Sequence, residues 1–180
     1  MNLKESLDVI KKHWNAAPVP VDTISWELGV PIMYANLPEN ISGAITKDGS
    51  AAYKIVVNEN HTKTRRRFTI AHELGHFIYH RDLLGKGVGD TRAYRAEDTP
   101  YPNINITAVQ ERQANTFAAN LLMPNHLIKE LQAKGLKSPQ QLAQALEVSE
   151  AAMRIKLGVD REPVGQEDGE PSDEWKPPHL

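Results

Sequence analysis

The chain has 180 residues, of which 40% are hydrophobic and 24% charged, with a formal net charge of −2 and no cysteine. This size and composition fit one globular domain with a small appendage, and the lack of cysteine excludes zinc fingers, thiolate metal sites and cysteine nucleophiles. No apolar run approaches the roughly 18–20 residues of a membrane span, and the first residues lack a signal-peptide core. We therefore expect a cytoplasmic protein with no membrane partner.

The first third of the chain predicts two helices followed by strands. Apolar residues at helical spacing predict an amphipathic helix over residues 3–14. A shorter helix follows, capped by Asp22 or Thr23 and ended by Gly29, and residues 30–34 then have the composition of a strand.

A hairpin and a long helix are predicted next. Residues 41–57 contain two strand-like runs that flank residues 47–50, and the Asp-Gly pair in this linker is a strong turn signal. The helix begins at Thr62 or Thr64 and continues to about His80, with apolar residues at helical spacing along it.

The second half of the chain predicts a long loop and then more helices. Residues 84–107 are rich in Gly, Pro, Asp and Asn and are longer than most loops of compact domains. A helix over residues 108–122 ends before Pro124. Residues 138–158 have the pattern of two short helices joined by a tight turn, as in a helix-turn-helix.

The C-terminal residues 161–180 differ in composition from the rest. They carry a net charge of −4 and four prolines, and such a segment buries too little apolar surface to order itself. The rest of the chain then has a net charge of about +2, which is too small to indicate nucleic-acid binding by itself.

The most informative motif is the HELGH sequence of residues 72–76 in the long helix. Two histidines four residues apart lie one above the other on a helix, so His72 and His76 can bind one metal ion. Glu73 is then placed to take a proton from a metal-bound water. The motif predicts a metal-assisted hydrolase.

A catalytic zinc needs a third protein ligand, and His80 is one candidate. On an unbroken helix, however, His72 and His80 are about 12 Å apart along the axis. A third histidine reaches the ion only where the helix turns away, and residues 77–79 contain no glycine that would permit this turn. His80 is better interpreted as a helix C-terminal group near the metal ligands or the substrate.

Glu111, on the helix over residues 108–122, is the better candidate for the third ligand. Small residues at helical spacing would let this helix lie close to the HELGH helix and direct the carboxylate of Glu111 at the metal. These small residues are Ala114, Ala118 and Ala119.

Two motifs in the same order carry a resemblance to a known family. FTIAHELGHFIYH, followed by ERQANTFAANLLMP, resembles the ImmA/IrrE family of zinc-dependent endopeptidases, over residues 1 to about 128. The resemblance implies one Zn²⁺ per chain, bound by His72, His76 and Glu111, with Glu73 as general base.

The fold class that follows is α+β and zincin-like, with a small antiparallel sheet packed against the HELGH helix and a second ligand helix. We expect a metallopeptidase domain over residues 1–128, a helix-turn-helix-like extension over residues 129–160, and a disordered acidic tail over residues 161–180.

Peptide hydrolysis at this site also needs a donor for the oxyanion that forms at the scissile carbonyl. The sequence does not choose among several candidates, and a further residue could orient a metal ligand. The oxyanion candidates are His80, Tyr94, Tyr101, Arg112 and His126, and the orienting residue is Asn115.

The resemblance implies a protein substrate of the regulatory kind, such as a helix-turn-helix repressor or an antitoxin encoded nearby. Two alternatives remain: a toxin-like protein that acts by binding a cognate antitoxin, and a DNA-binding regulator with a structural metal site. The basic cluster of residues 63–67 could contact phosphate or an acidic partner, or could simply be a solvated first helical turn.

Overall fold

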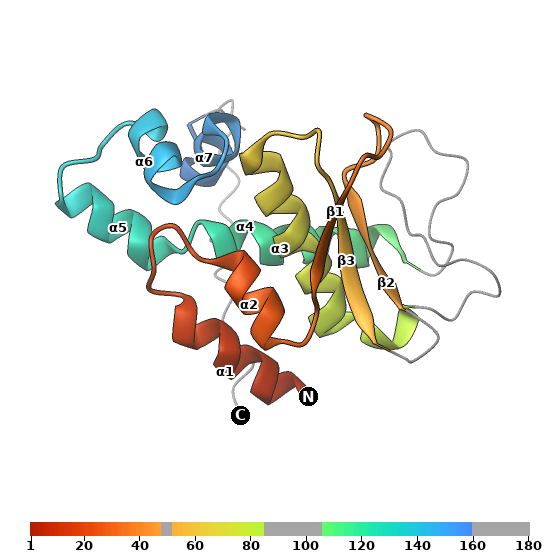
Figure 1. Cartoon of the computed structure of the whole chain (residues 1–180). Coiled ribbons are helices and arrows are strands. Elements are labelled where there is room, and N and C mark those ends of the chain that lie inside the picture. Colours follow the sequence, from red (N-terminus) through yellow and green to blue (C-terminus); the bar gives the residue numbers. More distant parts are fainter. Residues whose placement is uncertain (48–51, 85–105, 160–180) are drawn as a thin grey trace.

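The computed structural model describes residues 1–47, 52–84 and 106–159. It has an α+β fold in which a three-stranded sheet lies at one side of a group of helices (Figure 1). The α+β class expected from the sequence is therefore confirmed. No helix among these residues combines the length and the apolar character needed to cross a membrane.

The first two helices are present, as expected, and contribute residues to the hydrophobic core. In α1 (Leu3–His13), Asn2 and Glu5 form a reciprocal capping box, and the buried face includes Leu7 and Ile10. The helix α2 spans Val21–Glu27 and therefore begins before both of the expected cap residues.

The expected cap of α2 by Asp22 or Thr23 is wrong. Pro20 is the N-cap, and no side chain caps the helix. The carboxylate of Asp22 instead accepts a hydrogen bond from the hydroxyl of Tyr34, at 3.1 Å. Gly29 follows the helix with φ +73°, a conformation that favours glycine.

The sheet contains three strands in the order β1-β3-β2, namely β1 (Ile32–Ala35), β2 (Gly43–Lys47) and β3 (Tyr53–Asn58). The pair β2–β3 is antiparallel, as the hairpin predicted, but β1 runs parallel to β3. The sheet is therefore mixed, and the expectation of an antiparallel sheet is wrong. Strand patterns predict where strands occur and leave their direction open.

Asn58 holds the segment that crosses from β1 to β2. Its side-chain amide, fully buried, donates to three backbone carbonyls of residues 37–41, at 2.8–3.1 Å. Because these bonds satisfy the carbonyls of an irregular segment, they fix β2 at the sheet edge opposite β1.

The central helix α3 (Lys63–Tyr79) packs on the sheet and on α4 (Ala108–Leu122), which crosses behind it in Figure 1. Thr62 caps α3 by accepting a hydrogen bond from the amide of Arg65, and Thr107 forms a capping box with Gln110 at the start of α4. A short 3-10 helix, η1 (Arg81–Leu83), follows α3.

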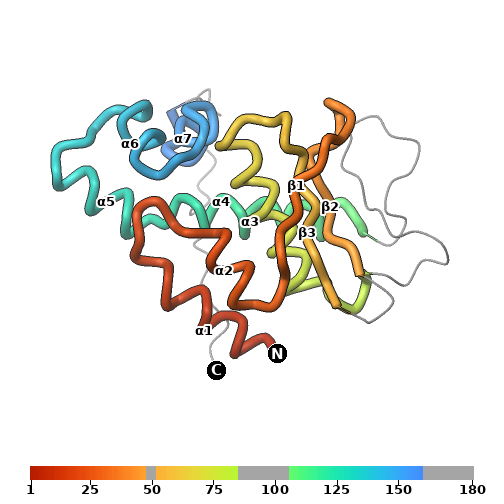
Figure 2. Tube along the Cα trace, viewed as in Figure 1, coloured from red at the N-terminus to blue at the C-terminus, as the bar shows by residue number. Residues whose placement is uncertain are grey.

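Three helices complete the described chain: α5 (Asn125–Ala133), α6 (Pro139–Leu146) and α7 (Glu150–Leu157). Ser138 caps α6 and Ser149 caps α7, each by accepting a backbone hydrogen bond with its side-chain oxygen. In Figure 2 the α6–α7 pair lies at the N-terminal end of α3, and its residues Leu142, Leu146 and Met153 join the common hydrophobic core. The predicted acidic tail lies outside the described residues.

Candidate metal centre

The helix α3 supplies two adjacent imidazoles. His72 and His76 are one turn apart, their ring centroids are separated by 4.5 Å, and both side chains are buried. Phe68, a further turn toward the N-terminus, stacks on the ring of His72. Packing therefore fixes the ring orientations that a metal site requires.

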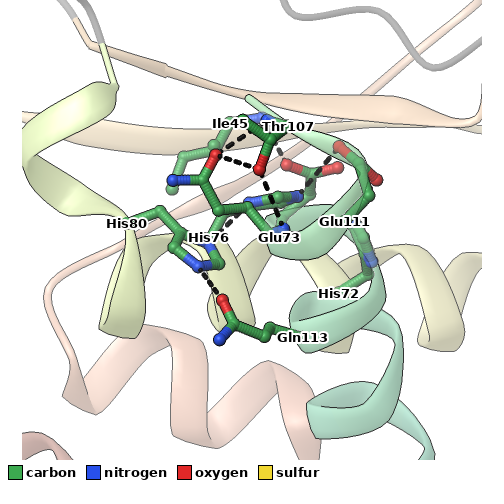
Figure 3. Close-up of polar contacts among 9 residues, drawn as sticks. Ile45, His72, Glu73, His76, His80, Thr107, Glu111 and Gln113 are labelled. Atoms are coloured by element: carbon green, nitrogen blue, oxygen red, sulfur yellow. Dashed lines mark hydrogen bonds and ion pairs between the residues drawn. The ribbon is translucent and has the colours of Figure 1, made fainter. Parts of the chain in front are cut away.

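The helix α4 brings Glu111 to the same place (Figure 3). One carboxylate oxygen lies 3.4 Å from His76 Nε2, and the other lies 3.7 Å from His72 Nε2. The three ligand atoms lie within 4.8 Å of one another. Two neutral imidazoles and one carboxylate form the donor set of a catalytic divalent metal, so these residues can hold a metal ion.

Gly75 is what allows the two helices to approach so closely. A Cβ atom built on Gly75 would lie 3.0 Å from Cδ1 of Phe117 and 3.1 Å from Cα of Ala114. Ala114 and Ala118, both fully buried, leave room on the α4 side. The small residues of both motifs therefore determine the distance between Glu111 and the two histidines.

Glu73 is anchored to the sheet. Its carboxylate oxygen Oε2 accepts a hydrogen bond of 3.0 Å from the backbone amide of Ile45 in β2, and the side chain is buried (Figure 3). A charge-assisted bond from a backbone amide favours the ionised carboxylate. This contact fixes the carboxylate of the residue that follows His72 in the sequence.

His80 lies next to the cluster but is not part of it. Its Nδ1 is 3.1 Å from Nδ1 of His76, and its Nε2 is 2.9 Å from the side-chain oxygen of Gln113 in α4. Gln113 was not a candidate from the sequence, because an exposed glutamine on a helix has no distinguishing pattern. Only the packing of α4 on α3 brings it to His80.

The contacts of His80 fix the proton positions of two rings. An amide oxygen only accepts, so Nε2 of His80 carries a proton and its Nδ1 accepts from Nδ1–H of His76. The lone pair of His76 then lies on Nε2, which faces Glu111. Burial lowers the pKa of His80, although the bond to Gln113 partly opposes this, and the lowered pKa favours the neutral ring.

The structure places the remaining predicted residues on α4, on α5 or outside the described residues. Tyr94 and Tyr101 lie outside the described residues. Arg112 and Asn115 are exposed on α4, and His126, in α5, packs its ring edge-on against Trp14 with centroids 5.2 Å apart. The oxyanion donor therefore remains a prediction.

Comparisons with known proteins agree with this arrangement. The family described as the IrrE N-terminal-like domain (Peptidase_M78) matches residues 27–158. A search of curated proteins found no match. Among solved structures, a Mycobacterium tuberculosis transcriptional regulator has the same fold with a TM-score of 0.58 and 14% sequence identity.

The alignment covers 90% of this chain and 48% of the regulator, so this chain spans about half the length of that protein. At this identity the likeness concerns the fold alone. The family match extends over both motifs and over the helices that carry the His–His–Glu cluster. The chain belongs to the ImmA/IrrE family, whose members are typically metal-dependent.

Proposed function

We propose that this protein is a zinc-dependent endopeptidase. The observation that carries the proposal is the cluster of His72, His76 and Glu111, with the anchored carboxylate of Glu73 beside His72. Two imidazoles and one carboxylate favour zinc among the common divalent ions. A bound zinc would supply Lewis acidity at the scissile carbonyl and a water activated near neutral pH.

Each residue has a separate role in this proposal. His72, His76 and Glu111 bind the ion, and Glu73 takes a proton from the attacking water and passes it to the leaving amine. The hydrogen bond from Ile45 holds the carboxylate of Glu73 in position before the water attacks the scissile carbonyl. His80 and Gln113 orient the ring of His76.

The proposed substrate is a regulatory protein, such as a helix-turn-helix repressor or an antitoxin, and this rests on the family resemblance. The substrate can be sought by incubating the metal-loaded protein with products of neighbouring genes. Cleavage fragments identified by mass spectrometry would define the bond that is cut.

The Glu73→Gln variant tests the mechanism. Glutamine keeps the shape of the side chain and can still accept from the amide of Ile45, but it is no base. We expect about one zinc per chain, measured by elemental analysis, and loss of at least about 100-fold in cleavage rate. A variant that binds zinc and cleaves at the rate of the original protein would contradict the proposal.

The two alternatives predict different results with the same variant. A toxin-like protein that acts by binding would keep its activity after Glu73→Gln. A DNA-binding regulator would bind DNA after chelation of the metal. One contact disfavours DNA binding: Lys156, one of two basic residues of α7, donates a hydrogen bond of 2.8 Å to Asn120 of α4.

A further inference from the structure

A cavity of about 150 Å³ lies beside α3, between α2, β1 and the first two turns of that helix. About 10–15 Å³ of such space is enough for one water molecule, so the cavity has room for a small ligand. It lies apart from the metal centre, with which it shares no residue. Its lining consists of Asp22, Tyr34, Lys63, Arg66, Arg67 and Ile70.

Acidic residues neutralise only part of the positive charge at this cavity. Glu147 lies 2.6 Å from Lys63 Nζ and 3.6 Å from a guanidinium nitrogen of Arg67. Asp22, the one acid in the lining, accepts a hydrogen bond from the hydroxyl of Tyr34. The three cations therefore face two carboxylates.

Arg66 is the cation without an acidic partner among residues 1–47, 52–84 and 106–159. Its side chain is half-buried, and its guanidinium lies 5.5 Å from the centre of the Tyr34 ring. The ring positions the guanidinium but does not neutralise it. The planar fork of N–H donors on an arginine matches the oxygens of a phosphate group.

The surroundings of Arg66 increase the attraction for an anion. The first turn of α3 contains no acid, although the positive end of a helix dipole favours one. The guanidinium of Arg67 is held rigidly, because it donates to the carbonyls of Val19 at 2.8 Å and Glu147 at 3.3 Å. A ligand would therefore meet donors that are already fixed in place.

We propose that this cavity binds a phosphate-class oxyanion, either inorganic phosphate or the phosphate group of a small molecule, with Arg66 as its principal ligand. Lys63 and Arg67 add positive charge to the same cavity. Both also pair with Glu147, which lies in the turn between α6 and α7. Binding is thus linked to the contact between the C-terminal helices and α3. This role is independent of peptide hydrolysis.

The test is a titration of the metal-loaded protein with inorganic phosphate, followed by NMR of backbone amides and by calorimetry. Sodium chloride at the same ionic strength is the salt control. We expect saturable shifts of the amides of residues 63–67, and binding at least about tenfold weaker in Arg66→Gln. The matched control is Arg65→Gln, because Arg65 bonds to Ser42 outside the cavity lining and its loss should change the affinity less than twofold.

Three results would overturn the proposal. The first is the absence of saturable binding beyond the chloride control. The second is equal binding by the original protein and Arg66→Gln, which would place the phosphate elsewhere, including at the metal. The third is binding of acetate as tight as that of phosphate, which would exclude a phosphate-specific site. Amide spectra without ligand show whether each variant is folded.

Discussion

Nδ1 of His76 lies 3.1 Å from Nδ1 of His80, so a candidate metal ligand of α3 is hydrogen-bonded to the residue that ends the same helix. The bond continues from Nε2 of His80 to the side-chain oxygen of Gln113 in α4. This connection orients the ring of His76 and leaves its Nε2 lone pair toward Glu111. Helix α4 therefore contributes the contact that orients the ring of His76 as well as the carboxylate of Glu111.

Loss of this connection should weaken metal binding. For His80→Phe and for Gln113→Ala we expect a zinc dissociation constant about 10–100-fold higher, the range typical for residues that orient a ligand. Competition with a chromophoric chelator measures the constant, and the ¹⁵N shifts of His76 report its tautomer. Gln113→Glu, which keeps an acceptor at the same position, should restore the tautomer that Gln113→Ala loses.

Thr116→Ala is the matched control for Gln113→Ala, because Thr116 is an exposed residue of the same helix. Its zinc affinity should equal that of the original protein. Equal affinities in Thr116→Ala and Gln113→Ala would show that the Gln113–His80 contact does not position His76.

Gly75→Ala should destabilise the protein, although helix propensity alone predicts a gain of about 1 kcal/mol. The added Cβ would meet Phe117 at 3.0 Å and the backbone of Ala114 at 3.1 Å. We expect a loss of about 1–3 kcal/mol in the free energy of unfolding, measured by urea denaturation, and weaker zinc binding because Glu111 moves with α4. A stabilised variant would show that the helices separate without cost.

The sequence predicted the members of the His–His–Glu cluster more completely than the contacts that support them. His72, His76 and Glu111 were named because their chemistry and spacing are distinctive, and the structure brings these three together. Gln113 and Ile45 were missed, because one is an ordinary helix residue and the other contributes only its backbone amide. Contacts of this kind depend on how elements pack, which periodicity does not encode.

The same dependence on packing explains which features of the fold could be predicted from the sequence and which could not. Helix breaks that act locally, such as Gly29 after α2 and Pro124 after α4, were found where expected. The parallel direction of β1 was missed, because the pattern of a strand does not encode the direction in which it pairs with its neighbour.

Arg67→Gln should destabilise the protein more than Lys63→Gln does, although both residues pair with Glu147. Arg67 is buried and also donates to the carbonyl of Val19, which would lose its partner. We expect a loss of about 1–3 kcal/mol for Arg67→Gln and of at most about 1 kcal/mol for Lys63→Gln, whose side chain is 66% exposed. Urea denaturation in the absence of phosphate measures both, and equal losses would contradict a structural role for Arg67.

The stability of the metal-free protein should fall as the pH decreases below about 6.5. Burial holds the pKa of His80 in the folded protein below its ordinary value of 6.5, so the unfolded chain binds this proton more readily than the folded one. The sign follows from linkage: the free energy of unfolding decreases from the unfolded pKa down to the folded pKa, by at most about 1.4 kcal/mol per pH unit for one group. Below the folded pKa, this residue causes no further loss.

His80→Gln removes the titrating ring from this position. Urea denaturation in a chelating buffer at pH 7.5 and 5.5 should therefore show a smaller loss of stability in His80→Gln than in the original protein. His61→Gln is the control, because His61 is a histidine outside the metal centre, hydrogen-bonded to the carbonyl of Glu39. An equal pH dependence in His80→Gln and the original protein would mean that His80 is not held neutral by its burial.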